Sequence, residues 1–134
     1  MGGPRGLRLL LDTHALIWLF EGSKRLPQSV VERIDAADSE VRVSAVSALE
    51  VTMKFRIGKL PHMADLANNF QALMLEYGFR ELPITTAHAR TAGLLESPHR
   101  DPFDRLLIAQ ALAEGLTLVS NEILFDAFGV SRLW

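Results

Sequence analysis

The chain has 134 residues, 49% hydrophobic and 22% charged, values that are ordinary for a single globular domain spanning 1–134. It contains no cysteine, which excludes disulfides and thiolate chemistry. The net charge of −2 and the pI near 6.1 lack the basic excess that is usual for proteins that bind nucleic acid.

The chain begins with a short, polar, turn-forming segment, residues 1–6, that we expect to be flexible. This segment lacks the apolar stretch of a signal peptide. No later apolar run approaches the roughly 20 residues that a membrane span requires. These features predict a cytoplasmic protein with no membrane contact.

Strands and helices alternate along the rest of the chain. Short apolar or β-branched runs predict strands over residues 7–11, 41–43, 79–82, 116–119 and 130–134. Apolar residues at helical spacing predict helices over 26–34, 44–58, 61–78, 85–95 and 101–115, with shorter ones over 15–20 and after 122. This alternation predicts an α/β fold with a mostly parallel sheet that helices cover on both faces.

Acidic residues follow three of the predicted strands, and ligands of such sheets bind outside the carboxyl ends of the strands. Asp12 directly follows the first strand and opens a helix. Asp is a favoured helix cap, so capping alone is one interpretation of Asp12. The positive end of the helix is also expected to keep its carboxylate ionised, as a metal ligand requires.

Glu50 lies about two turns into the helix that follows the second predicted strand. On a helix surface it would pair with Lys54, four residues on, for about 0.2–0.5 kcal/mol. The segment 45–51 around it is mostly apolar, however. A carboxylate in that setting favours an interpretation in which Glu50 faces a cation.

Asp101 and Asp104 frame the start of the helix 101–115. Asp101, Pro102 and Asp104 are residue types that favour the N-terminus of a helix at these positions. Capping by itself is sufficient to explain Asp101. Asp104 lies one turn into the helix, where we expect it to point across the strand ends towards Asp12. Its functional interpretation is the stronger of the two.

Glu122 follows the strand 116–119 by three residues and repeats the position of Asp12 just past a strand end. Ser120 and Asn121 beside it would hold a water or a phosphate, although both residue types also favour turns. Taken alone, Glu122 is an ordinary surface acid, and the repeated pattern is what singles it out.

A cluster of carboxylates selects hard cations, Mg²⁺ or Mn²⁺, which activate water for attack on a phosphate. The sequence has no glycine-rich phosphate loop, nucleophile elbow or H-E-x-x-H zinc motif. The four histidines lie far apart in sequence, and none is assigned to a metal. His14 and His99 flank the acids and are candidates for contact with substrate.

Three segments resemble the PIN-domain ribonucleases, and more narrowly the VapC-type toxins of bacterial toxin–antitoxin pairs. They are Leu9–Trp18, Ser44–Glu50 and Asp101–Gln110. The C-terminal segments 118–122, 125–130 and 132–134 are similar to that branch as well. The resemblance covers nearly the whole chain in the family's order and spacing.

The resemblance implies an α/β/α sandwich and a Mg²⁺- or Mn²⁺-dependent endoribonuclease that hydrolyses RNA phosphodiester bonds. It implies that Asp12, Glu50 and Asp104 bind the metal and that Asp101 is an additional acid. Glu122 occupies a position where the family usually has Asp, so its contact with metal is expected to run through water. A homodimer, a small antitoxin that covers the site, and a structured RNA substrate such as tRNA are also implied.

Two alternatives remain open at this point. Haloacid-dehalogenase-like phosphatases also place Asp after a strand, but they need a second acid two residues on, where this chain has His14. A binding module of the same fold would use the acids only as caps. For the nuclease, Lys54, Arg100 and Arg105 are candidate phosphate contacts.

Overall fold

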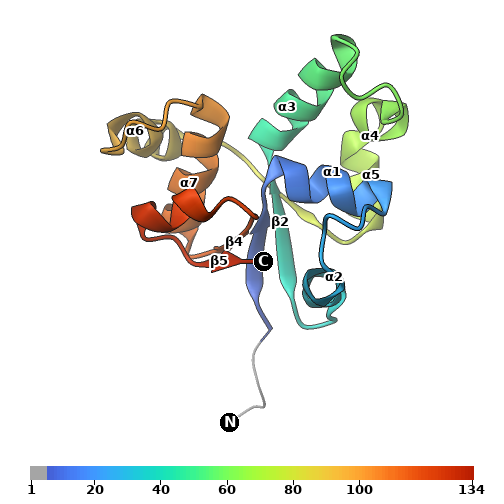
Figure 1. Ribbon diagram of the computed structural model, residues 1–134, viewed down its shortest axis with the longest axis horizontal. Coiled ribbons are helices and arrows are strands. Elements are labelled where there is room, and N and C mark those ends of the chain that lie inside the picture. Colours follow the sequence, from blue (N-terminus) through green and yellow to red (C-terminus); the bar gives the residue numbers. More distant parts are fainter. Residues whose placement is uncertain (1–5) are drawn as a thin grey trace.

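The computed structural model of the protein describes residues 6–134, which form a five-stranded sheet with helices on both faces (Figure 1). The strands are β1 (Arg8–Leu11), β2 (Glu40–Ser44), β3 (Arg80–Leu82), β4 (Thr117–Val119) and β5 (Arg132–Leu133). The helices are α1 (Thr13–Glu21), α2 (Gln28–Asp35), α3 (Ala45–Arg56), α4 (Ala64–Asn68), α5 (Phe70–Glu76), α6 (Thr86–Leu94), α7 (Pro102–Glu114) and the 3₁₀ helix η1 (Ile123–Phe128). The strand order is β3-β2-β1-β4-β5 with all pairs parallel, which confirms the predicted α/β sandwich.

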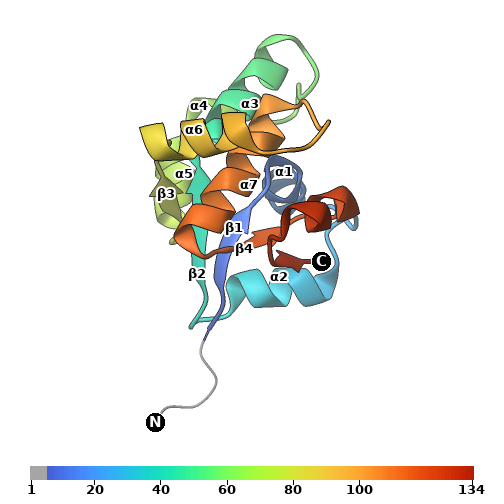
Figure 2. The same ribbon diagram turned by 90° about the vertical axis from the view of Figure 1, so that its left-hand side faces the viewer.

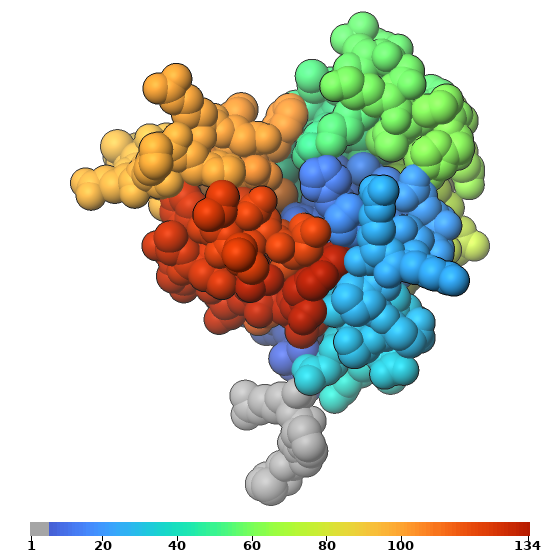
Figure 3. Space-filling model, viewed as in Figure 1, coloured from blue at the N-terminus to red at the C-terminus, as the bar shows by residue number. Residues whose placement is uncertain are grey.

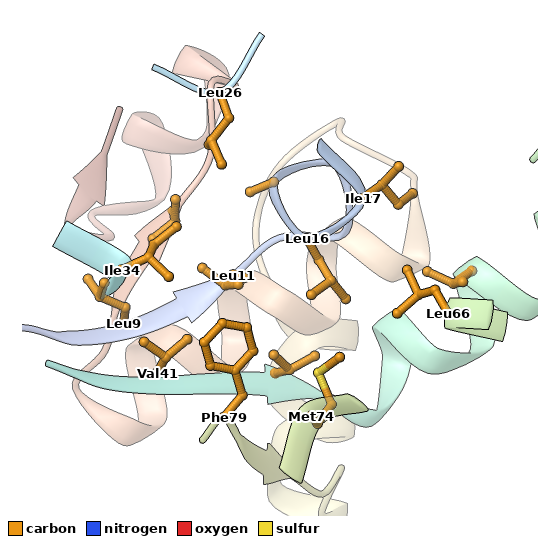
Figure 4. Packing of buried hydrophobic residues seen from close by; sticks show 14 of the residues in the cluster. Leu9, Leu11, Leu16, Ile17, Leu26, Ile34, Val41, Leu66, Met74 and Phe79 are labelled. Carbon is orange, nitrogen blue, oxygen red and sulfur yellow. The ribbon is translucent and has the colours of Figure 1, made fainter. Parts of the chain in front are cut away.

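β1 lies at the centre of the sheet because its residues are apolar on both faces. Leu9, Leu10 and Leu11 are fully buried. Leu9 and Leu11 belong to a core cluster that includes side chains of α1, α2, α4 and α5. Figure 4 shows members of this cluster, such as Leu16 and Met74, gathered between the strands and these helices.

The opposite face of the sheet is covered by α7. Leu107 and Ile108 of α7 are buried in a second cluster with Leu10 and Leu118 of the strands. Viewed from this side, α7 crosses in front of the strands and α6 lies beside it (Figure 2). The alternation of Leu9, Leu10 and Leu11 between the two clusters is what a strand period of two requires.

The helix predicted over 61–78 is wrong as a single element, because α4 and α5 are separate helices. Asn69 between them has φ −125° and ψ 32°, outside helical geometry. Its side-chain amide donates to the Asp65 carboxylate at 2.8 Å, a bond between side chains that ties Asn69 to α4.

β1 and β4 are the neighbouring strands at which the strand order of the sheet reverses. The chain passes from β1 to β2 on one side, whereas β4 pairs with β1 on the other. Such switch points are where parallel sheets form ligand crevices. The amide of Asp12 donates to the carbonyl of Val119 at 3.0 Å, so the carboxyl ends of these two strands meet.

Residues 1–5 of the segment predicted to be flexible lie outside the described residues. Within 6–134, no helix combines the length and the apolar character that crossing a membrane would require.

Candidate active site

Asp12 lies at the carboxyl end of β1 and caps α1. Its carboxylate accepts a hydrogen bond from the amide of Ala15 at 2.7 Å, and the residue is only 6% exposed. Burial raises the pKa of this carboxyl, although the Ser120 hydroxyl and the Ala15 amide favour the charged form. Desolvation therefore outweighs the cap in its effect on this pKa, in the direction opposite to the one expected from the helix start.

Glu50 reaches the same end of the sheet from α3. The ion pair with Lys54, which was the alternative to a cation-facing Glu50, is formed with Nζ 2.8 Å from Oε2, and the Glu50 side chain is 12% exposed. A buried hydrogen bond of 3.0 Å between the hydroxyls of Thr13 and Ser47 joins α1 to α3. Glu50 is thus both half of an ion pair and a neighbour of the acids on other elements.

Asp101 and Asp104 come from the start of α7. Asp101 caps the helix by accepting from the Phe103 amide at 2.9 Å, as predicted. Asp104 Oδ2 lies 2.9 Å from Nε2 of His99. Burial raises the pKa of Asp104 against the effect of His99, and the charges of Asp101 and Glu50 raise it further.

Arg105 does not face a phosphate site, so that prediction is wrong. Its guanidinium donates to five backbone carbonyls at the end of α6 and in the following loop, those of Ala92, Gly93, Leu95, Ser97 and His99. Arg105 therefore holds the loop that carries His99. Arg100 is exposed and stays a candidate phosphate contact.

Glu122 follows β4 and caps η1. Its Oε1 accepts from the Leu124 amide at 3.1 Å, and its own amide donates to the buried Ser120 hydroxyl at 3.1 Å. The turn expected from Ser120 and Asn121 is thus formed. Asn121 is exposed beside it.

One cavity of about 220 Å³ brings together every acid predicted for the site. It is lined by Asp12, His14, Trp18, Glu50, Asp101, Asp104, Asn121, Glu122 and Phe125. In the space-filling view, blue atoms of α1 lie in an indentation bordered by orange, red and green segments (Figure 3).

Trp18 and Phe125 were not predicted to line this cavity. Trp18 follows His14 by four residues on α1, so helical spacing from His14 would have found it. Phe125 lies on η1, whose 3₁₀ geometry gives no comparable periodic signal in the sequence.

Residues 9–130 match the PIN domain family, which is most of the chain. The chain belongs to the PIN-domain family. This PIN domain is 30% identical to Ribonuclease VapC22 of Mycobacterium tuberculosis over 115 residues, which are 85% of this chain and 86% of that relative. The resemblance to VapC-type proteins that the sequence indicated is confirmed.

Solved structures share the fold of this PIN domain. VapBC2 from Rickettsia felis, bound to a DNA fragment from its promoter, aligns with TM-score 0.71 and 16% identity over 96% of this chain and 99% of that chain. FitAcB from Neisseria gonorrhoeae aligns with TM-score 0.70 and 20% identity over 94% and 96% of the two chains.

The donor set of the PIN domain's cavity fits a hard divalent cation, because all its charged donors are carboxylates. Within residues 6–134, however, no three acidic or histidine side chains converge as a ready-made metal site. Glu50 is directed to Lys54, and Asp104 to His99. In each of these two carboxylates the contact involves one oxygen, Oε2 of Glu50 and Oδ2 of Asp104, which leaves the other oxygen for a cation.

Proposed function

We propose that this PIN domain is a Mg²⁺- or Mn²⁺-dependent endoribonuclease that acts as the toxin of a toxin–antitoxin pair. The observation that carries the proposal is the cavity at the ends of β1 and β4, in which carboxylates from four separate segments meet. A relative that is named a ribonuclease supports RNA as the substrate. Cytoplasmic location stays a prediction from the sequence.

In the proposed site, Asp12, Glu50 and Asp104 hold the cation, with Asp101 as an additional acid. A divalent cation would supply the positive charge that activates a water and offsets the charge growing on the phosphate. Burial of Asp12 lowers the dielectric around its carboxylate and strengthens its attraction for that charge.

His99 and Glu122 have supporting roles in this proposal. His99 orients the Asp104 carboxylate through the bond of its Nε2. One oxygen of Glu122 is engaged by the Leu124 amide, and its contribution to the cation site is proposed to run through a water.

A small antitoxin and a second copy of the chain are the proposed partners. The similar structures are described as complexes, among them a toxin–antitoxin complex from Klebsiella pneumoniae that aligns with TM-score 0.67. An open cavity of carboxylates is a surface that a basic side chain of an antitoxin would fill. A structured RNA such as tRNA is the proposed target.

The test is cleavage of a total RNA pool, with mapped cut sites, by the purified protein in Mg²⁺, in Mn²⁺ and in EDTA. Cleavage is expected only with the divalent ions, and Asp12→Asn is expected to abolish it. Asp35→Asn is the matched control, because Asp35 is exposed and lies at the end of α2, outside the cavity. Cleavage that persists in EDTA contradicts the proposal.

A calorimetric titration with Mn²⁺ separates the nuclease from a non-catalytic binding module. The nuclease is expected to bind Mn²⁺ and to lose that binding in Asp12→Asn. Turnover of a small phosphate ester through a covalent intermediate on Asp12 would instead favour the phosphatase alternative.

A further inference from the structure

The cavity lined by Asp12 and the other acids, here called the acidic cavity, has a second cleft beside it. His14 and Trp18 line both. It has a volume of about 430 Å³, within the roughly 300–1,000 Å³ that is usual for ligand sites. Its wall is formed by α1, by Arg25 in the connection from α1 to α2, and by the segment from the end of α3 to residue 62. We call it the basic cleft.

Three cationic side chains line the basic cleft, those of Arg25, Lys54 and Lys59. The carboxylate of Glu21 also lines it, but Glu21 is paired with His62. Lys54 is itself paired with Glu50, which lines the acidic cavity. Three cations against the single carboxylate of Glu21 still leave this wall positive, in a chain whose overall charge is −2. This positive wall lies next to the acidic cavity, with which it shares His14 and Trp18.

The turn at the end of α3 places Lys54 and Lys59 on the same wall of the cleft. The amide of Lys59 donates to the carbonyl of Lys54 at 2.9 Å, and Gly58 between them has φ +82°. This left-handed turn folds the chain back at the helix end, as glycine allows. Lys59 is exposed, and within residues 6–134 it forms no ion pair, so its charge is available to a ligand.

Aromatic rings form the border between the basic cleft and the acidic cavity. The exposed ring of His14 stacks on Trp18 with centroids 5.6 Å apart and planes at 27°. The guanidinium of Arg25 lies 5.9 Å from the centroid of Trp18. Aromatic faces beside cations are the combination that binds single-stranded nucleic acid, with bases on the rings and phosphates on the cations.

We propose that the basic cleft binds the nucleotide of single-stranded RNA that adjoins the cleaved bond. Lys59 and Arg25 contact its phosphate, and its base extends the stack of His14 on Trp18. The inference rests on the proposed nuclease function, because the shared border makes the cleft continuous with the acidic cavity. It adds the requirement that the substrate is unpaired on this side of the cut.

The test measures binding of a labelled single-stranded oligoribonucleotide by fluorescence anisotropy across a range of salt concentrations. The protein carries Asp12→Asn, so that the ligand stays intact in Mg²⁺. Lys59→Gln removes one exposed cation of the cleft, and Arg90→Gln is the matched control, since Arg90 is an exposed cation of α6 outside both cavities.

Lys59→Gln is expected to weaken binding several-fold and to reduce the slope of log K against log salt by about 0.7, the share of one phosphate contact on a single strand. Arg90→Gln is expected to leave both quantities unchanged. Equal affinities and slopes for the two variants overturn the proposal. This binding readout is independent of catalysis, so a failure of RNA cleavage by the wild-type chain is seen separately.

A second variant tests the base. The oligoribonucleotide is expected to bind about tenfold more tightly than an abasic strand of equal length, an effect typical of one base stacked on an aromatic ring. His14→Ala is expected to abolish most of this preference, and an undiminished preference contradicts the stacking. Binding of an acidic peptide with the same Lys59 dependence, and no binding of the oligoribonucleotide, would assign the cleft to a protein partner and overturn the proposal.

Discussion

Arg105 is expected to contribute more to stability than any other exposed or half-buried cation of the α6–α7 region. Its guanidinium donates to the carbonyls of Ala92 and His99 at 2.8 Å each and to Leu95 at 2.5 Å, with two longer bonds of 3.4 Å. At about 1 kcal/mol net for each of the three short bonds, Arg105→Met should lower the free energy of unfolding by about 3 kcal/mol.

For a domain of this size the loss of about 3 kcal/mol corresponds to a fall in Tm of roughly 10 °C. Arg105→Lys should lose most of the same energy, because an ammonium lacks the planar set of donors that reaches carbonyls on several sides. Urea denaturation followed by circular dichroism measures both variants. The control is Arg100→Met, which changes an exposed arginine five residues earlier and should stay within about 0.5 kcal/mol of wild type.

The same substitution should also affect the site, because the loop held by Arg105 carries His99. Release of His99 leaves Asp104 without its partner, so Mn²⁺ affinity should change along with stability. If Arg105→Met unfolds within about 0.5 kcal/mol of wild type, the reasoning that these five bonds hold the loop is refuted.

Three further predictions concern the cap, the core and the turn. Because the pKa of Asp12 is raised in the folded state, its contribution to stability is present at low pH and is lost as pH rises through the folded-state pKa. Asp12→Asn should therefore reduce the decline of the free energy of unfolding over that pH range. Urea titrations in EDTA, compared as wild type minus variant, measure the difference. Leu10→Ala should cost about 2–5 kcal/mol in the same urea assay, because Leu10 of β1 is fully buried against α7. Gly58→Ala should cost about 1 kcal/mol, since an L side chain at φ +82° is strained, whereas Gly93→Ala, in helix α6 with open space around it, should be neutral or stabilising by thermal melts.

The sheet was predictable because its signals are local. The run Leu9–Leu11 is apolar on both faces, and this is the property that requires a central strand in a parallel sheet. The acids after β1 and β4 were predictable for a related reason, since the carboxyl ends of parallel strands must meet at one edge. Glu50 and Asp104 depended further on the resemblance to known sequences.

Features that depend on tertiary contacts could not be predicted in this way. Arg105 follows Asp104 in a capping segment and has the sequence character of a surface cation, but its partners are carbonyls that α6 brings close only in the folded chain. The upward shift of the Asp12 pKa also depends on tertiary contacts, because it arises from how deeply the folded chain buries the carboxyl. The break at Asn69 was missed because apolar spacing continues on both sides of it.

The electrostatics of the cavity distinguish its acids from one another. Glu50 is compensated by Lys54 at 2.8 Å, and Asp104 by His99 at 2.9 Å. Asp12 is the most deeply buried of the acids, and among residues 6–134 it has no basic side chain in an ion pair. A cation that entered the cavity would gain most from Asp12, whose burial is otherwise a cost to folding. We therefore expect Asp12 to determine whether a cation binds, and Glu50 and Asp104 to determine how tightly, since the charge of each is already partly offset by its present partner.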